Sequence, residues 1–135
     1  MKYHVLTLFP EMIENTVNTS ITGRALKSGK ISLHTVNIRD FADNKHMRVD
    51  DYPYGGGAGM VMQAEPVFRA YESVRKESQA ARQGKKPRCI YLTPQGQVFR
   101  QTMVEELAME EELIFLCGHY EGIDERVLEE VVTDY

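Results

Sequence analysis

Four short runs of apolar and β-branched residues along the chain predict strands. Three of them are followed within two residues by proline or glycine, which is typical of strands that end in a turn. The expected strands are Tyr3–Phe9, Ile31–Ile38, Cys89–Leu92 and Leu113–Cys117. The last two are short and almost wholly apolar, which indicates strands that are buried on both faces of a sheet.

The spacing of apolar residues between these runs predicts helices. One helix spans Glu11–Val17, with Pro10 in its first turn. Ser20 or Thr22 caps a second short helix that ends at Gly29. By contrast, residues 41–62 carry four glycines and no helical period, which indicates a loop or an irregular hairpin.

The second half of the chain repeats a strand–helix pattern. A helix opens at Glu65-Pro66, a polar and basic stretch over Ala80–Pro87 indicates an exposed linker, and Asp124 caps a helix from Glu125 onward. We expect residues 127–135 to belong to one short helix. Apolar positions mark two helix faces: Val67, Ala70, Tyr71 and Val74 in the first case, and Val98, Phe99, Met103, Val104 and Leu107 in the second.

Strands that alternate with helices predict an α/β fold, with a mostly parallel sheet flanked by helices and buried on both faces. Ligands of such sheets bind in loops beyond the carboxyl ends of the strands. Residues 93–96 and 118–122 are expected at two such ends, and both segments contain glycine.

Composition and charge narrow the possible classes of protein. With 135 residues, 42% hydrophobic and 27% charged, the chain fits one globular domain and excludes collagen-like, disordered and disulfide-framework proteins. No apolar run approaches the roughly 18 residues that span a bilayer. Cys89 and Cys117 lie in apolar runs and are interpreted as buried, reduced thiols. We therefore expect a cytoplasmic protein with no membrane partner.

The charges are unevenly distributed along the chain. Residues 1–100 carry 15 basic and 9 acidic side chains, whereas residues 101–135 carry 1 and 11. A basic body of this kind can bind a polyanion on one face although the whole chain is acidic.

A glycine-rich motif is the most unusual segment of the chain. VDDYPYGGGAGMVM, at 49–62, has glycine at positions 55, 56, 57 and 59, which lets a flat base or a phosphate approach the main chain. No Gly-Lys-Ser/Thr follows, so a nucleotide P-loop is disfavoured. Asp50-Asp51 and Tyr54 add carboxylates and an aromatic ring, which argues against a simple flexible turn.

Two further motifs lie at the expected carboxyl ends of strands. LTPQG, at 92–96, offers main-chain groups and an amide, and CGHYEGIDER, at 117–126, places Tyr120 and Glu121 between two glycines. Tyr120 can stack on a ring, and Glu121 can accept hydrogen bonds from hydroxyl or ammonium groups or can instead cap a helix. Histidine is the side chain type that can titrate near neutral pH, but His119 is interpreted as an ordinary exposed or hydrogen-bonded histidine and not as a catalytic base.

Together these motifs resemble the bacterial tRNA (guanine-N1)-methyltransferases, which belong to the knotted SPOUT methyltransferases. The resemblance is collinear from Met1 to Tyr135. The segments that carry it are LFPEM at 8–12, TGRA at 22–25, RDF at 39–41, VDDYPYGGGAGMVM, LTPQG and CGHYEGIDERV at 117–127.

The resemblance implies a trefoil knot, a homodimer and methyl transfer from S-adenosyl-L-methionine to N1 of guanosine 37 in tRNA. It implies that the cofactor is bound by Leu92, Thr93, Pro94, Gln95 and Gly96 and by Gly118, Tyr120, Glu121 and Gly122. It implies that the target guanine and its tRNA meet Asp50, Gly55, Gly56, Gly57 and Gly59, with Arg24, Lys45 and Arg48 toward phosphate.

The family pattern also extends past Tyr135. A third cofactor loop, an arginine, the catalytic aspartate and a tRNA-binding domain are expected there. We therefore interpret residues 1–135 as a methyltransferase domain that lacks its C-terminal part, and assign no catalytic residue. We expect a polypeptide that ends at Tyr135 to be inactive. His119 occupies a position that is arginine in many members.

Other interpretations remain open from the residues alone. The chain can be an inactive fragment, or a dimerisation or RNA-binding module of the same fold. A methyltransferase for another RNA and a nucleotide enzyme that uses the glycine loop are further alternatives. The sequence indicates no structural metal, and a catalytic Mg²⁺ near Asp50 or Glu121 stays open.

Overall fold

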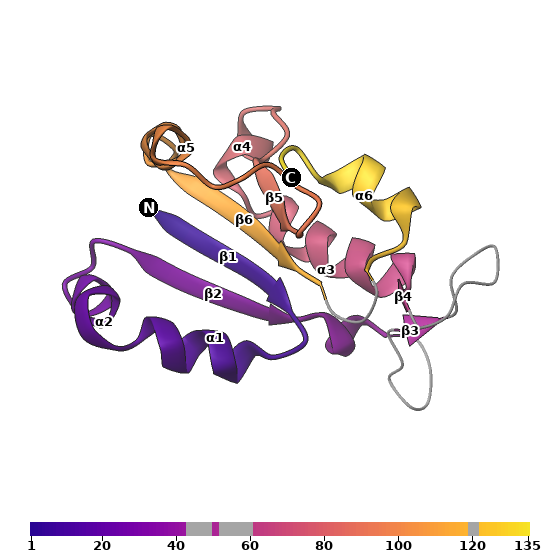
Figure 1. Cartoon of the computed structure of the whole chain (residues 1–135), viewed down its shortest axis with the longest axis horizontal. Helices are drawn as coiled ribbons and strands as arrows, with labels where there is room; N and C mark the ends of the chain where they lie inside the picture. The colour runs from indigo at the N-terminus through magenta and orange to yellow at the C-terminus, as the bar shows by residue number, and fades with distance from the viewer. Residues whose placement is uncertain (43–49, 52–60, 119–121) are drawn as a thin grey trace.

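A four-stranded parallel sheet forms the centre of the molecule (Figure 1). The computed structural model describes residues 1–42, 50–51, 61–118 and 122–135, and only the main chain of residues 50, 51 and 61. The strands are β1 (Lys2–Thr7), β2 (Ser32–Asn37), β5 (Cys89–Leu92) and β6 (Glu112–Cys117). They stand in the order β2-β1-β6-β5, and every neighbouring pair is parallel. The expected α/β class is confirmed, whereas the knot stays a prediction.

One face of the sheet is well covered. The helices α3 (Ala64–Arg75) and α6 (Glu125–Val131) bury apolar side chains against it. Residues that alternate along the strands, such as Leu6, Ile114 and Leu116, complete this core. The predicted apolar face of α3 is confirmed, since the four residues expected on it are all buried: Val67, Ala70, Tyr71 and Val74.

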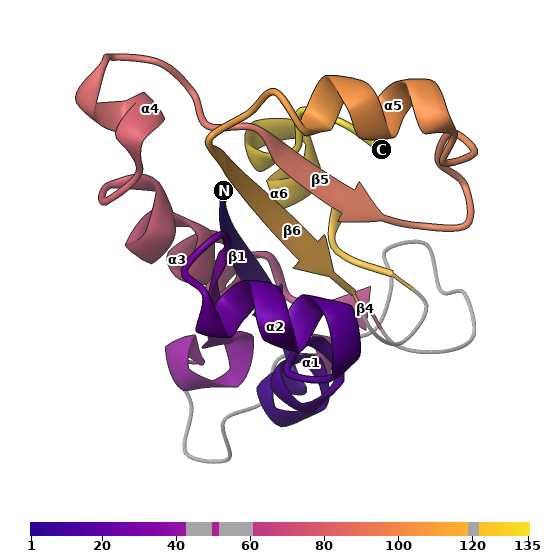
Figure 2. The same ribbon diagram turned by 90° about the vertical axis from the view of Figure 1, so that its left-hand side faces the viewer.

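The opposite face is less covered than the sequence predicts. The helices α1 (Pro10–Val17) and α2 (Ser20–Lys27) lie in front of the sheet in Figure 2, and α5 (Gln101–Leu107) lies beside β5 and β6. Leu107 is the only buried residue of α5, where it packs on Ile90 and Leu113. Tyr3 and Phe115 on this face are therefore only partly buried.

Three predicted boundaries are wrong. Val98 and Phe99 precede α5 and are 69% and 66% exposed, because the helix begins only after Arg100. The last helix ends at Val131 because the next residues pair with β5, where the Thr133 N–H donates to the Cys89 carbonyl at 2.8 Å. The expected linker contains α4 (Gln79–Arg82), whose first turn is capped by the Ser78 hydroxyl.

The start of α2 also differs from the prediction. Its N-cap is Thr19, and neither Ser20 nor Thr22 takes that place. The Thr22 hydroxyl instead donates to the Thr19 carbonyl at 3.0 Å. The helix ends at Lys27, and Gly29 follows in the left-handed region at φ +77°.

The segment 41–62, expected to form a loop or an irregular hairpin, has a hairpin at its base. A 3₁₀ turn, η1 (Ile38–Phe41), follows β2. The two-residue strands β3 (Asp50–Asp51) and β4 (Val61–Met62) then form an antiparallel pair. The glycines between these strands lie outside the described residues.

Candidate functional site

The two cofactor motifs leave the sheet side by side. Leu92 ends β5 and Cys117 ends β6, and these two residues are direct partners in the parallel register. Because the strands are parallel, the turn at 93–96 and the loop that begins at Gly118 start at the same end of the sheet, which we call its carboxyl edge. The predicted position of both motifs at carboxyl ends is therefore confirmed.

The first motif forms a compact turn after β5. The Gly96 N–H donates to the Thr93 carbonyl at 3.2 Å, and the Gln95 N–H donates to the Thr93 hydroxyl at 3.3 Å. Leu92, Pro94 and Gln95 are exposed, whereas Thr93 and Gly96 are partly buried. The turn thus has a fixed main chain and presents its side chains outward.

The second motif packs its two described glycines near one aromatic ring. A Cβ built on Gly118 would lie 3.3 Å from Cε1 of Tyr91, and Gly122 lies near the Tyr91 hydroxyl at φ +148°. The side chain of Tyr91 therefore lies against both ends of this loop. Tyr120 and Glu121, with His119, lie outside the described residues.

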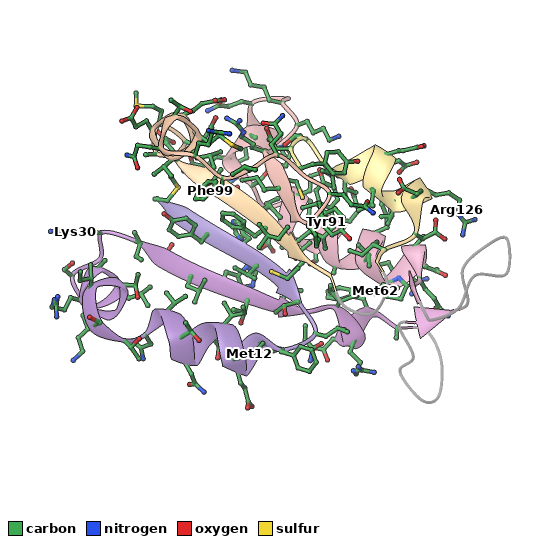
Figure 3. All side chains as sticks on the ribbon, in the orientation of Figure 1. Met12, Lys30, Met62, Tyr91, Phe99 and Arg126 are labelled. Atoms are coloured by element: carbon green, nitrogen blue, oxygen red, sulfur yellow. The ribbon has the colours of Figure 1, made fainter. Side chains whose placement is uncertain are left out.

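The base of the glycine-rich hairpin is joined to the second motif. The Met62 N–H donates to the Gly122 carbonyl at 2.9 Å, and the Asp124 N–H donates to the Met62 carbonyl at 3.1 Å. Tyr91 and Met62 lie toward the same end of the sheet in Figure 3. Sequence reasoning missed this junction, because no pattern within 49–62 indicates its partner.

The predicted tRNA-binding residues are placed only in part. Arg24 is exposed on α2, which precedes the amino end of β2 and so lies at the opposite end of the sheet from the two motifs (Figure 1). Within this chain the structure does not bring Arg24 to the carboxyl edge. Of Asp50 only the main chain is described, and Lys45, Arg48, Gly55, Gly56, Gly57 and Gly59 lie outside the described residues.

Helix α6 begins directly after the second motif and fixes its exit. The Asp124 carboxylate accepts a hydrogen bond from the Arg126 N–H at 3.0 Å and pairs with the Arg126 guanidinium at 2.7 Å. The side-chain hydrogen bond from Arg126 lowers the pKa of Asp124. The predicted cap is confirmed, and this carboxylate stays ionised near neutral pH.

Neither the phenol of Tyr91 nor the thiol of Cys117 is a proton acceptor at neutral pH. Burial raises the pKa of the Tyr91 phenol and that of the Cys117 thiol, so both stay protonated. The cysteines differ from the prediction in one respect, since Cys89 is buried but Cys117 only partly so. Among the residues that the structure describes, no three His, Cys, Asp or Glu side chains gather as metal ligands.

An apolar cavity of about 440 Å³ opens beside the first motif. Its lining combines strand, turn and chain-end residues, among them Ile90, Leu92, Thr93, Phe99, Phe115 and Tyr135. Its size is within the usual range for small-molecule pockets. Sequence reasoning missed it, because Phe99 was expected on a helix.

No helix within the described ranges is long and apolar enough to cross a bilayer.

Comparisons with known proteins agree with this arrangement. The family model for tRNA (guanine-1)-methyltransferase TrmD matches residues 1–135. A curated tRNA (guanine-N(1)-)-methyltransferase of Lachnospira eligens is 59% identical over 135 residues, which cover 100% of this chain and 55% of the relative. One from Clostridioides difficile is 47% identical over 134 residues, covering 99% and 56%.

A solved structure shows the same fold. The crystal structure of tRNA (m1G37) methyltransferase from Aquifex aeolicus has a TM-score of 0.84 and 36% identity, covering 98% of this chain and 56% of that one. The chain thus spans about half the length of the curated relatives and of the solved protein that it matches.

Proposed function

Because the chain belongs to the tRNA (guanine-1)-methyltransferase family, we propose that its full-length protein transfers a methyl group from S-adenosyl-L-methionine to N1 of guanosine 37 in tRNA. Full-length here means a protein of the relatives' length that contains these 135 residues. The observation that carries the proposal is the register of Leu92 with Cys117, which puts both cofactor motifs at one edge. The relatives' names support this reaction, and we propose that it takes place at this end of the sheet.

The two motifs fit a nucleoside cofactor. Leu92, Thr93, Pro94, Gln95 and Gly96 offer a fixed turn in which main-chain N–H and C=O groups can pair with the edge of an adenine ring. When bound, S-adenosyl-L-methionine supplies a methyl group on a sulfonium centre.

The second motif completes the proposed cofactor site from the other side. Gly118 and Gly122, at the two ends of this loop, both lie close to the side chain of Tyr91. Tyr120 and Glu121 would then bind the ring and the ribose hydroxyl or ammonium groups.

The target base requires a proton acceptor. N1 of guanine carries a proton at neutral pH, so a base must remove it as the new N–C bond forms. Tyr91 and Cys117 stay protonated and Asp124 is paired with Arg126. We therefore assign no described residue as the general base.

The glycine-rich hairpin is proposed to receive the target guanine. Its base is hydrogen-bonded to Gly122 through Met62, so the hairpin leaves from the end of the cofactor loop. Methyl transfer needs near-attack distance between the methyl group and N1, which this junction favours. Asp50 and Gly55, Gly56, Gly57 and Gly59 would contact the base, while Arg24, Lys45 and Arg48 would contact tRNA phosphates.

The remaining features of the family are part of the same proposal. We propose a cytoplasmic homodimer in which residues 1–135 form the main part of the methyltransferase domain. Arg24, which lies away from this chain's own site, would reach tRNA bound mainly at the partner's site. A Mg²⁺ requirement would appear as loss of turnover on chelation with EDTA.

The assay for this function is methyl transfer to tRNA by the full-length protein. Purified protein, S-adenosyl-L-methionine with a labelled methyl group and unmodified tRNA are incubated, and the tRNA is digested to nucleosides. We expect 1-methylguanosine from tRNA with guanosine at position 37 and none from a tRNA with adenosine there. Label in another nucleoside would favour a methyltransferase for a different site. No label and no cofactor binding would favour the alternative of an inactive module.

A further inference from the structure

The last three described residues lie along β5 and are joined to it by hydrogen bonds and one isolated bridge. The Thr133 N–H donates to the Cys89 carbonyl at 2.8 Å, and the Tyr91 N–H donates to the Asp134 carbonyl at 3.0 Å. Asp134 forms a parallel bridge with Ile90. The outer strand β5, which leads into the first motif, is therefore paired along its side with residues 133–135. We call residues 133–135 the edge segment.

A bidentate ion pair between the side chains of Arg88 and Asp134 fixes the edge segment. Arg88, just before β5, donates from Nε to Oδ2 of Asp134 at 2.9 Å and from Nη2 to Oδ1 at 3.1 Å. Both side chains are mostly shielded, at 22% and 27% exposure. A planar guanidinium that meets both carboxylate oxygens restricts direction as well as distance, which a lysine cannot do.

The same arginine also binds carboxylates from outside the edge segment. Glu106 Oε1 lies 2.8 Å from Nη2, and Glu110 Oε1 lies 3.4 Å from Nη1. These glutamates belong to α5 and the residues after it. The side-chain hydrogen bonds that Arg88 donates to Asp134 and then to Glu106 raise the pKa of Arg88, and the bond to Arg88 lowers the pKa of Asp134. Arg88 and Asp134 are thus both ionised at neutral pH. The ion pair between Arg88 and Glu106 does not include the edge segment, so a substitution of Glu106 serves as a control.

The far end of the edge segment contacts the cofactor turn. The Gln97 N–H donates to the Tyr135 carbonyl at 3.4 Å. A Cβ on Gly96 would lie only 2.7 Å from the Tyr135 carbonyl carbon, so main chain packs directly on main chain. Where the edge segment lies therefore determines where the 93–96 turn can lie.

We propose that the Arg88–Asp134 ion pair positions the S-adenosyl-L-methionine turn, by holding the edge segment in register with β5 and its end against Gly96. Arg88 and Asp134 are positioning residues, since they act through the main chain of Tyr135. The proposal rests on the proposed function, because it assigns the cofactor to this turn.

The test compares Asp134→Asn and Arg88→Lys with Glu106→Gln in the full-length protein. Asp134→Asn keeps the shape of the side chain but removes its negative charge. Arg88→Lys keeps the positive charge but removes the planar guanidinium group that donates two parallel hydrogen bonds. For both we expect the KM for S-adenosyl-L-methionine to rise roughly five- to tenfold, which is less than the full cost of a lost charged hydrogen bond because the pair acts on the turn only through the main chain. The kcat and the KM for tRNA should stay within about twofold, and Glu106→Gln should behave as the unaltered protein in all three.

A second measurement does not depend on activity. In the same variants, hydrogen–deuterium exchange is followed at the amides of Tyr91 and Gln97, which donate to the edge segment. We expect faster exchange in Asp134→Asn and Arg88→Lys, and no change in Glu106→Gln. Unchanged exchange at both amides in Asp134→Asn would overturn the positioning role whether or not the protein is active.

The two hypotheses fail in different ways. If the unaltered protein transfers no methyl group, the proposed function fails, and the exchange data still decide whether the ion pair holds the turn. If the unaltered protein is active but Asp134→Asn has an unchanged KM for the cofactor, the positioning role fails alone. Equal effects of Asp134→Asn and Glu106→Gln would also overturn it, because they would indicate only a general loss of stability.

Discussion

Gly96 and Tyr135 are in direct main-chain contact, although they are far apart in the sequence. A Cβ atom built on Gly96 would lie 2.7 Å from the carbonyl carbon of Tyr135 and 3.1 Å from its carbonyl oxygen. Real Cβ atoms essentially never come as close as the first of these distances. The obstacle is main chain, which cannot rotate away as a side chain can. Any residue other than glycine at position 96 must therefore displace either the turn or the edge segment.

The first prediction concerns this contact. Gly96→Ala in the full-length protein should weaken binding of S-adenosyl-L-methionine by roughly fivefold to a hundredfold, because relief of a clash of this kind costs about 1–3 kcal/mol. Isothermal titration calorimetry measures the change. Gln97→Ala, a substitution at the exposed neighbouring side chain, is the matched control and should bind as the unaltered protein. An unchanged Kd for Gly96→Ala would contradict a role of this turn in binding the cofactor.

Helix capping by Asp124 gives a prediction about stability. Its carboxylate accepts from the Arg126 N–H at the start of α6, so Asp124→Ala should lower the free energy of unfolding by about 1 kcal/mol. Urea denaturation measures this change. Glu129→Ala, at an exposed position of the same helix, should change stability by less than about 0.5 kcal/mol. Equal losses in both variants would show that the cap contributes nothing.

The buried imidazole of His4 predicts loss of stability in mild acid. Its Nδ1 lies 3.1 Å from Nδ1 of His34 on β2, and its Nε2 lies 3.5 Å from Glu112 on β6. Burial lowers the pKa of His4 below its ordinary value of 6.5, against the opposing effect of Glu112, and Lys2 also lowers it. Between this lowered pKa and pH 6.5, the His4 side chain therefore binds more protons in the unfolded chain than in the folded one.

The contribution of His4 is accordingly complete above pH 6.5 and is lost as the pH falls below that value. Urea unfolding of the chain at pH 7.5 and at pH 5.5 should show a lower free energy of unfolding at pH 5.5. His4→Gln, which cannot titrate, should show a smaller difference between the two conditions. The same difference in both proteins would mean that His4 is not the group responsible.

Cysteine reactivity tests the burial of β5 and β6. Burial raises the pKa of the Cys89 thiol to about 12, and it also raises that of Cys117. Since the thiolate is the reactive form, iodoacetamide at pH 8 should modify both thiols slowly in the folded chain and rapidly in urea. Intact mass against time reports this, and the Cys117→Ser variant isolates Cys89. Rapid alkylation of Cys89 in the folded chain would contradict its burial.

The sequence predicts the layers of this fold better than its edges. Short apolar runs such as Leu113–Cys117 and the apolar face of α3 are local signals, and the structure confirms both. Phe99 shows the limit, since its apolar character suggests a helix face, whereas it precedes α5 and is 66% exposed. Just before it, the Gln97 N–H donates to the distant Tyr135 carbonyl, a contact that no local pattern encodes.

The candidate site shows the same division. The glycine motifs and their strand ends are readable from residues alone, and Leu92 and Cys117 do end adjacent strands. The hydrogen bond from Met62 to Gly122 joins residues 60 positions apart, so it depends on the folded topology. The Arg88–Asp134 pair likewise joins positions that only the completed sheet brings together.

The central claim is that the carboxyl edge of β5 and β6 binds S-adenosyl-L-methionine. Hydrogen–deuterium exchange of the full-length protein, with and without S-adenosyl-L-methionine, tests it most directly. We predict slower exchange in peptides that cover residues 93–97 and 118–123, and little change in peptides from α2 at the opposite end of the sheet. Protection confined to other segments, or none while calorimetry reports binding, would contradict the claim.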